Sequence, residues 1–554
     1  MTKQTIPIST TDAFIASFLM ITFFFLNGWM AEDAFITFRV IDNFINGYGL
    51  RWNIDERVQV YTHPLWMILL TPIYAVTKDA VLTALIACTI CSAASLVILW
   101  RFSTDKLSIL LLIMLPLICS VTIRDFMISG MENCLNFLLL SGFLYILFSK
   151  IDQKKIYLLC VIAGLLLLTR LDNIFVIAPV LMWLVFTYKK QLSLLFLIIT
   201  QIPVILWYVF SLIYYGFLFP NTKYAKLNTG LTPQDLLPQG IRYMENFLYY
   251  DTAAALIILL AFSLSIYFFY KKRLRIIRNA EETAIALLLT GCVIHIAYVI
   301  WIGGDMMSGR FMMNIILICI IVLFHLFAKF DKHCHTIFLV ALLSITFVQT
   351  VFLSNIVPYR NSDITDYRNV VFRERDYYKH ETTVQHHFLP NFTTTPVHTW
   401  IDKVEKHKKK RGVIVQRNIG MYGFYSRRQR IIIDTFALAD PFLARLPIIK
   451  SEKYWRAGHY RREVPAGYVK ARATGDTRHM NPELAEYYRL LREVTAGDIW
   501  SFRRIKAIFG FQTNAYDYLL ADASAILHSA ATKRKAYEER LRKRKTTKYI
   551  LKTK

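Results

Sequence analysis

The chain has 554 residues, of which 55% are hydrophobic and 14% aromatic, and its formal net charge is +26. A soluble protein could not cover so much apolar surface with polar residues, so the composition excludes an ordinary soluble chain and favours a membrane protein. The apolar residues gather in runs of roughly 15 to 25, the length that a helix needs to cross the hydrocarbon core of a bilayer.

Eleven of these runs are predicted to span the membrane as helices. In chain order they lie at 14–30, 80–100, 107–123, 134–148, 156–168, 174–187, 192–215, 252–270, 283–302, 311–328 and 336–353. The first run is not followed by a small-residue cleavage site, so we expect a span there and not a signal peptide. The run at 65–76 is apolar but short, and we expect it to form a re-entrant or interfacial helix.

The loops after alternate spans are rich in lysine and arginine, at 101–106, 150–155, 189–190, 271–278 and 329–332. The positive-inside rule places these loops in the cytoplasm. The loops on the other face, at 31–64, 124–133, 169–173, 216–251 and 303–310, carry polar residues in motif-like arrangements. We therefore expect a multi-pass protein of the cytoplasmic (inner) membrane with its chemistry on the extracytoplasmic face.

The sequence after residue 353 contains no further spanning run. Residues 1–353 are thus predicted to form a transmembrane catalytic domain, and residues 354–554 a soluble extracytoplasmic domain with a basic tail. Stretches at 412–416 and 431–434 predict strands around a glycine turn at 420–423, and 481–495 and 516–529 predict helices, which indicates an α+β domain. The tail at 533–554 is either a solvated segment or one that binds anionic headgroups or glycans.

The first outer loop begins with two adjacent carboxylates, Glu32 and Asp33, directly after a span. Carboxylates at the membrane boundary are costly unless they are used. They could cap a helix that begins at Ala34, or one of them could act as a general base on an acceptor hydroxyl. The glycine, aromatic and polar residues at 46–53 suit sugar binding. His63 closes the loop, where it has either a structural role or a contact with phosphate or sugar.

Several blocks along the outer loops and the C-terminal domain resemble one known family, the AftB-type arabinofuranosyltransferases of the GT-C superfamily. They lie at 32–36, 38–39, 47–49, 56–58, 62–66, 129–132, 169–172, 219–222, 224–226, 303–307, 310–311, 420–425, 434–435, 438–441 and 445–447. The blocks follow the family's order. The resemblance implies a GT-C fold, a polyprenyl-phosphate sugar donor, inversion at the anomeric carbon, and transfer of a pentofuranose, D-arabinofuranose above all, to a cell-surface glycan or glycoprotein.

Most candidate site residues lie in these blocks, while Lys223 is an outer-face cation and Trp455 belongs to an aromatic-basic stretch that suits glycans. The resemblance makes Asp33 the expected catalytic base, with Glu32 beside it. The residues expected to bind the donor are Arg310, Asp305, Lys223, Arg170, His63 and Asn221. Those expected to bind the acceptor, in the C-terminal domain, are Trp455, Tyr425 and Asp434.

The charged residues on the outer loops fit this chemistry, since a lipid phosphate leaves as an anion and needs cationic stabilisation. Each cation could instead be a boundary residue that reaches toward lipid headgroups. Arg310 is the strongest candidate, because two glycines that allow close backbone approach precede it and Asp305 can orient its guanidinium. Arg170 could simply form an ion pair with Asp172.

No zinc-like ligand spacing, P-loop or dinucleotide fingerprint occurs in the sequence, so no cofactor is certain and no nucleic acid or nucleotide partner is expected. A divalent cation held by Glu32, Asp33, Glu132 and Asp305 stays open. Two alternatives also stay open. One is a GT-C transferase that uses another lipid-phosphate sugar, and the other is a transporter of lipid-linked sugars, although charges at one boundary instead of the midplane argue against transport.

Overall fold

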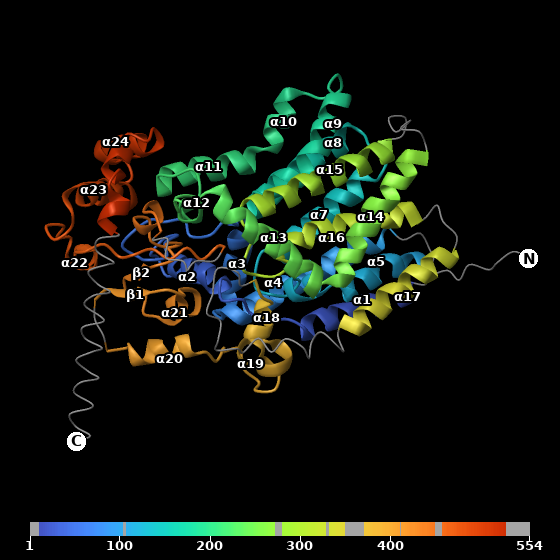
Figure 1. The fold of residues 1–554 in the computed structure, drawn as a ribbon, viewed down its shortest axis with the longest axis horizontal. Coiled ribbons are helices and arrows are strands. Elements are labelled where there is room, and N and C mark those ends of the chain that lie inside the picture. Colours follow the sequence, from blue (N-terminus) through green and yellow to red (C-terminus); the bar gives the residue numbers. More distant parts are fainter. Residues whose placement is uncertain are drawn as a thin grey trace, which may run out of the picture. The chain divides into compact units, whose positions relative to one another are not determined.

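The computed structural model describes residues 10–102, 107–271, 280–327, 332–349, 371–409, 412–448 and 457–527, and these residues are mostly helical (Figure 1). The chain divides into two compact units, each built from separate stretches of sequence. Unit 1 comprises Met1–Ile41, Thr62–Trp207 and Thr232–Thr399. Unit 2 comprises Asp42–Tyr61, Tyr208–Leu231 and Trp400–Lys554.

Unit 1 is a helical bundle. Its helices are α1 (Thr10–Leu26), α2 (Ala34–Ile45, which continues into unit 2), α3 (Pro64–Thr77), α4 (Ala80–Trp100), α5 (Leu107–Cys119), α6 (Val121–Phe126), α7 (Asn133–Leu147), α8 (Gln153–Thr169), α9 (Asn173–Thr187), α10 (Leu194–Thr200), α11 (Ile202–Tyr215, which ends in unit 2), α13 (Pro233–Tyr250), α14 (Thr252–Lys271), α15 (Ala280–Trp301), η2 (Arg310–Met312), α16 (Met313–Phe327), α17 (Lys332–Val348), α18 (Glu374–Tyr377), α19 (Lys379–Thr382) and η5 (Val384–Phe388).

Four described helical segments are long and apolar enough to cross a membrane, namely α4, α14, α15 and Arg310–Phe327. Helices α10 and α11 would make a fifth span if taken together, with a 57° bend between them. Five shorter apolar helices lie at Ile15–Leu26, Pro64–Thr77, Asn133–Leu147, Asn173–Thr187 and His333–Val348. The chain is therefore a membrane protein, while the number of eleven spans stays a prediction.

Two predicted runs are each broken into two helices, 192–215 into α10 and α11 and 107–123 into α5 and α6. Helix α5 ends at Cys119, and α6 begins at Val121. Ser120 separates them, because its hydroxyl accepts a hydrogen bond from the backbone N–H of Ile123 and so caps a new helix. A serine inside an apolar run does not mark a helix start in the hydropathy pattern, so the break was not predicted.

Three buried asparagines join α7, α9 and α16 in a closed ring of hydrogen bonds. The Asn136 amide donates to the Asn314 side-chain oxygen at 2.6 Å, Asn314 donates to Asn173 at 2.7 Å, and Asn173 donates back to Asn136 at 2.6 Å. Amide pairs between apolar helices fix their rotation and height, since an unpaired amide in an apolar interior is costly. Each asparagine lies within about one helical turn of a charged residue of the site described below.

Unit 2 contains the only regular strands among the described residues, together with short helices. They are α12 (Asn221–Leu227), α20 (Thr399–Lys406, whose first residue belongs to unit 1), β1 (Ile414–Gln416), α21 (Gly420–Tyr425), β2 (Ile432–Asp434), η6 (Leu443–Arg445), α22 (Tyr468–Thr474), α23 (Pro482–Ala496), α24 (Phe502–Gln512) and η7 (Asp517–Leu520). Strands β1 and β2 are parallel, with Gln416 opposite Asp434.

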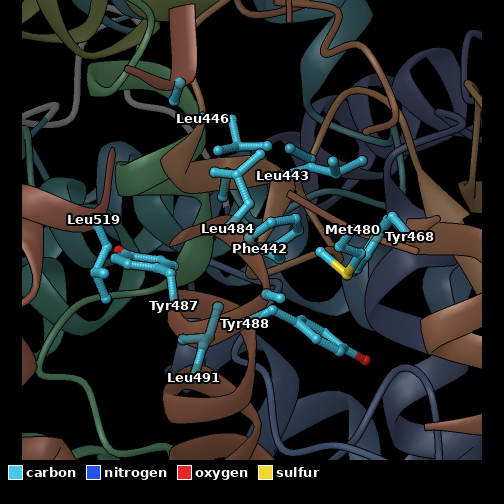
Figure 2. Close-up of a cluster of buried hydrophobic side chains, with 14 of the residues drawn as sticks. Phe442, Leu443, Leu446, Tyr468, Met480, Leu484, Tyr487, Tyr488, Leu491 and Leu519 are labelled. Atoms are coloured by element: carbon cyan, nitrogen blue, oxygen red, sulfur yellow. The ribbon is translucent and has the colours of Figure 1, made fainter. Parts of the chain in front are cut away.

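The core of unit 2 is a cluster of aliphatic and aromatic side chains from β2, η6, α22, α23 and η7 (Figure 2). The two strands and α23 confirm the predicted elements at 412–416, 431–434 and 481–495. The predicted glycine turn is the short helix α21, and the helix expected at 516–529 starts as the 3-10 turn η7, with residues beyond 527 outside the described part. Helix α24 was not predicted.

The loop 42–61 is part of unit 2 through buried polar contacts. The Asn53 amide donates to the Ile432 carbonyl at 3.0 Å and accepts from the Ile432 N–H at 3.1 Å, which fastens the loop to β2. Arg472 pairs with Glu56 at 2.7 Å and with Asp55 at 3.0 Å. Unit 2 is thus discontinuous in sequence, whereas the boundary predicted between residues 353 and 354 stays a prediction.

Candidate functional site

In unit 1, four separate segments meet at one buried carboxylate. Glu132 precedes α7, and its side chain is 1% exposed. Its Oε1 accepts from Arg310 Nη2 at 3.0 Å and from Arg170 Nη1 at 3.3 Å, and its Oε2 lies 3.3 Å from His63 Nδ1. Three residues predicted to bind the donor therefore lie around a carboxylate that the sequence suggested only as a possible cation ligand.

Arg170 is held on both sides. Its Nε donates to Asp172 Oδ1 at 3.0 Å and its Nη2 donates to Asp172 Oδ2 at 2.8 Å, while its guanidinium carbon lies 4.9 Å from the centre of the Phe311 ring. The ion pair considered from the sequence exists, and Arg170 contacts Glu132 in addition. A bidentate pair with a stacked ring leaves this guanidinium in one orientation.

Arg310 has one N–H group that donates a hydrogen bond to no described residue. Its Nη1 lies 3.6 Å from Asp305 Oδ2, as expected for a carboxylate that orients the guanidinium. Its buried Nε has no hydrogen-bond partner in the described part of the chain. A buried donor without a partner costs free energy, which is recovered when a ligand supplies an acceptor.

The glycines before Arg310 have a structural reason that differs from the expected one. Gly303 and Gly304 have φ values of +84° and +70°. A Cβ on Gly304 would lie 2.5 Å from Tyr243 Cβ, so glycine is needed for close packing of this turn against α13. The Tyr243 hydroxyl accepts from the Phe311 N–H at 3.1 Å, which holds the start of the Arg310 segment.

The electrostatics of the cluster favour an ionised Glu132. Burial raises the pKa of this carboxyl, but the guanidiniums of Arg310 and Arg170, together with His63 where it is protonated at low pH, outweigh burial and lower the pKa to about 2. Burial, together with the two guanidiniums, lowers the pKa of His63 even though Glu132 raises it. His63 is therefore neutral at pH 7, and its Nε2 lies 2.9 Å from Thr37 Oγ1.

The two predicted catalytic carboxylates, Glu32 and Asp33, lie directly before α2. This helix begins at Ala34, as expected if the carboxylates cap it. Glu32 is buried and Asp33 is partly exposed. Asp33 lies close enough to Arg310 for their charges to interact. The base candidate and the strongest donor-binding candidate thus share one region of unit 1.

Glu374 and Tyr378 also belong to this region, since both lie close enough to Glu32 and Asp33 to interact with them electrostatically, and the sequence predicted neither. Backbone hydrogen bonds from Met30 to the Thr382 carbonyl at 3.0 Å and from Val384 to the Gly28 carbonyl at 2.8 Å bring the segment after residue 371 beside residues 28–30.

Glu374 is 4% exposed, and its Oε2 has no hydrogen-bond partner among the described residues. Burial raises the pKa of Glu374 well above its usual range, and the neighbouring Asp33 and Glu32 raise it further. Glu374 therefore holds its proton more tightly than an ordinary glutamate and can donate a hydrogen bond where a carboxylate could not.

The described residues contain no group of three or more His, Cys, Asp or Glu side chains arranged to hold a metal ion. The divalent cation considered from the sequence therefore has no such ligand cluster in this part of the chain.

The remaining predicted site residues belong to unit 2, apart from Trp455, which lies outside the described residues. Lys223 is exposed, with its ammonium 3.4 Å from the centre of the Phe219 ring. The Asn221 amide donates to the carbonyls of residues 437 and 438 at 2.9 and 3.0 Å. Tyr425 is half-buried at the end of α21. The side-chain N–H groups of Asn221 are thus occupied by hydrogen bonds within unit 2.

Asp434 ends β2 and is fully buried. Its carboxylate accepts from the N–H groups of Phe436 at 2.8 Å and Ala439 at 3.0 Å, which shapes the loop after the strand. Burial raises its pKa to about 7, against the opposing effect of these hydrogen bonds. This geometry gives Asp434 a structural function, and its predicted contact with the acceptor stays a prediction.

The chain is similar to the terminal β-(1→2)-arabinofuranosyltransferase of Corynebacterium glutamicum. The two are 26% identical over 319 residues, which cover 51% of this chain and 46% of the Corynebacterium protein. The match thus spans about half the length of that curated relative. No protein-family model matches the sequence, and no solved structure matches it significantly. The chain is therefore a membrane protein related at a distance to an arabinofuranosyltransferase.

Proposed function

We propose that this chain transfers D-arabinofuranose from a polyprenyl-phosphate donor to a hydroxyl group of a cell-surface glycan or glycoprotein, with inversion at the anomeric carbon. The reaction takes place on the extracytoplasmic face of the cytoplasmic membrane. One observation carries the proposal most directly, namely the meeting of Arg170 and Arg310 at Glu132 in the region that also holds Asp33. The similarity to a terminal arabinofuranosyltransferase supports the choice of sugar.

The guanidiniums bind and stabilise the phosphate. As the bond between the anomeric carbon and the phosphate oxygen breaks, negative charge grows on the departing polyprenyl phosphate. Arg310 offers its partnerless Nε, and Glu132 and Asp305 hold its guanidinium from the other side. Donors fixed before the reaction stabilise this charge without reorganising during the reaction.

Asp33 accepts the proton of the acceptor hydroxyl as its oxygen forms the new bond to the anomeric carbon. The acceptor attacks from the side opposite the leaving phosphate, so the configuration inverts. Glu374, with a raised pKa, keeps its proton beside Asp33 and adds little negative charge to the region. Asp33 can then act as the general base without a second negative charge from Glu374 beside it.

The charge balance of the empty cluster sets a condition on donor binding. Glu132, Asp172 and Asp305 already surround the two guanidiniums, and His63 is neutral. A phosphate anion therefore meets a region without excess positive charge. Protonation of His63 on binding would supply the missing charge, because a nearby anion favours the imidazolium form.

A membrane assay tests the proposed function. Membranes that contain the chain are given radiolabelled polyprenyl-phosphoryl-arabinofuranose and the surface glycan extracted from cells that lack the chain. Label should move from the lipid to the glycan, and the Asp33→Asn variant should not transfer it. Transfer from a hexose donor, with none from the arabinofuranose donor, would contradict the proposed sugar. Accumulation of an arabinofuranose lipid in deletion cells is an independent check.

A further inference from the structure

Unit 2 contains a cavity of about 410 Å³ at the carboxyl ends of its two parallel strands. Gln416, the last residue of β1, and Arg417 line the cavity from one strand, and Thr435, which follows β2, lines it from the other. Trp400 and Lys403 line it from α20. Ligands commonly bind beyond the carboxyl ends of parallel strands, where loops diverge and leave a crevice. Its volume suits one small ligand.

The walls of the cavity are fixed by backbone hydrogen bonds. The Thr435 N–H donates to the Gln416 carbonyl at 2.9 Å, and the Arg462 N–H donates to the Thr435 carbonyl at 2.7 Å. The buried Arg462 guanidinium also donates to three carbonyls within 2.8 Å, those of residues 446, 460 and 225. Arg462 is therefore a structural residue of the wall, and its charge contributes to the local field.

The lining is strongly basic. Lys403, Arg417 and Arg461 join Arg462, and Glu463 is the acidic residue among the side chains that line the cavity. Lys403 and Arg417 are exposed, so water now solvates them and a ligand can reach them. A concave surface with this charge attracts anions, since its field lines concentrate in the cavity.

The lining also offers groups that recognise sugars. Trp400 and Lys403 are three residues apart on α20, so the indole and the ammonium lie on the same side of the helix. The flat indole suits the apolar face of a sugar ring. The Gln416 amide and the Thr435 hydroxyl can exchange hydrogen bonds with sugar hydroxyls.

We propose that this cavity binds an anionic monosaccharide unit, one that carries a carboxylate or a phosphate, within the glycan that the chain modifies. The assignment to the acceptor rests on the proposed function, whereas the binding of an anionic sugar does not. In this proposal the Arg170 and Arg310 cluster of unit 1 binds the polyprenyl phosphate. The cavity of unit 2 binds the acid group of the acceptor. The chain would then select acidic glycans over neutral ones.

The test measures binding of three probes to the full-length chain in lipid nanodiscs by ligand-observed NMR titration. The probes are methyl glucuronide, methyl glucoside 6-phosphate and uncharged methyl glucoside. We expect at least one of the two anionic probes to bind with an affinity about tenfold or more higher than that of the uncharged probe. Comparison of the two anionic probes tells a carboxylate ligand from a phosphate ligand.

The matched variants are Lys403→Gln with Arg417→Gln, and Arg489→Gln on the exposed surface of α23 as the control. The double variant should lose about tenfold or more of the affinity, while the control and Asp33→Asn should bind as the unaltered chain does. Because the replaced side chains are exposed, the variants should fold.

Equal binding of the uncharged probe, unchanged affinity in the double variant, or no binding of any probe would overturn the proposal. Binding by a chain that transfers no arabinofuranose would support this cavity and contradict the proposed function, so the two can fail separately.

Discussion

Glu132 sets the orientation of the side chains around it, because it is the carboxylate that Arg170, Arg310 and His63 share. We expect Glu132→Gln to lower both stability and donor affinity, since it leaves two guanidiniums short of a buried counter-charge. Loss of one partner of a buried ion pair costs roughly 3 to 5 kcal/mol. Thermal unfolding of the purified protein checks this, and the surface variant Glu486→Gln is the control.

The pKa of Glu132 gives that effect a pH dependence. Its folded-state pKa of about 2 lies below the ordinary value, so its contribution to stability is present above pH of about 4 and is lost as the pH falls toward 2. The Tm of the unaltered chain should thus drop more steeply below pH of about 4 than that of Glu132→Gln. Parallel curves would contradict the ionised, charge-paired state of this residue.

Asp33 and Arg310 should give separable phenotypes. Asp33→Asn keeps the shape of the side chain but cannot accept the acceptor proton, and loss of a general base typically lowers the rate by about 10² to 10⁴. Donor binding should persist in that variant. Arg310→Ala should instead weaken donor binding, which is measured by titration with a short-chain polyprenyl-phosphoryl-arabinofuranose. Near-normal turnover by Asp33→Asn would make Asp33 a capping residue and leave Glu32 or Asp305 as the base.

His63 is expected to couple donor binding to proton uptake. Its pKa is lowered in the empty site, mainly by burial, and a bound phosphate would raise it again. Donor affinity should therefore be highest below the pKa of the empty site and fall as the pH rises from there to the pKa of the bound state. His63→Gln should flatten this profile, whereas the exposed His479→Gln should not. Identical profiles for the His63 variant and the unaltered chain would contradict the coupling.

Of the side chains that form the site in unit 1, the sequence predicted some but not all. Arg310, Asp305, Arg170 and His63 were expected on one face because their loops alternate with basic ones, and the structure brings these four together. The central role of Glu132 and the presence of Glu374 were not predicted. Glu374 lies between two arginines, a pattern typical of an exposed segment. Its burial depends on backbone pairing with residues 28–30, which leaves no local signal.

Among the elements, the asparagine ring of α7, α9 and α16 is the best test of how the helices hold the site. We expect Asn173→Leu to remove one hydrogen-bond partner from the side-chain amide of Asn136 and one from that of Asn314. Hydrogen bonds between helices in membranes contribute about 0.6 kcal/mol on average and up to about 1.7 kcal/mol. The loss should appear as a lower Tm and as weaker donor binding, because these helices carry Asp172, Glu132 and Arg310 near their ends.

Replacement of all three asparagines by leucine is the matched control for that prediction. Removing every amide leaves no unpaired polar group, so the triple variant should recover part of the Tm that the single variant lost. A single variant as stable as the unaltered chain would show that the ring does not hold the helices.

Hydropathy located the apolar helices because long apolar runs have few other stable states in a membrane. It missed helix limits that depend on single polar groups, such as the hydroxyl of Ser120. It also missed α13 and α24, whose polar residues interrupt the apolar pattern. The parallel strands were predicted from short alternating stretches, but the cavity at their ends depends on their pairing, which the sequence did not specify.

At the scale of the whole molecule, we expect a substitution that destabilises unit 2 to leave donor binding in unit 1 intact. Arg472 offsets Glu56, whose pKa is about 7 because burial raises it more than Arg472 lowers it. We expect Arg472→Ala to destabilise unit 2, and to do so more as the pH rises, because a carboxyl with a raised pKa loses stability when it ionises. Donor binding by the Arg310 site should remain.

The double variant Arg472→Ala with Glu56→Gln is the control, since it removes the unpaired charge and should restore much of the stability. Limited proteolysis of the loop at 42–61 reports the state of unit 2, and a donor titration reports that of unit 1. Equal loss of donor binding in Arg472→Ala and Arg310→Ala would contradict the separation.

The discontinuity of unit 2 also has a consequence for biosynthesis. Glu56 leaves the ribosome 416 residues before Arg472, the partner that pairs with it. At about 5 to 20 residues per second, that interval lasts roughly 20 to 80 s. During this time the carboxylates of the loop at 42–61 are without Arg472. The loop therefore cannot complete its buried ion pairs until Arg472 has been translated.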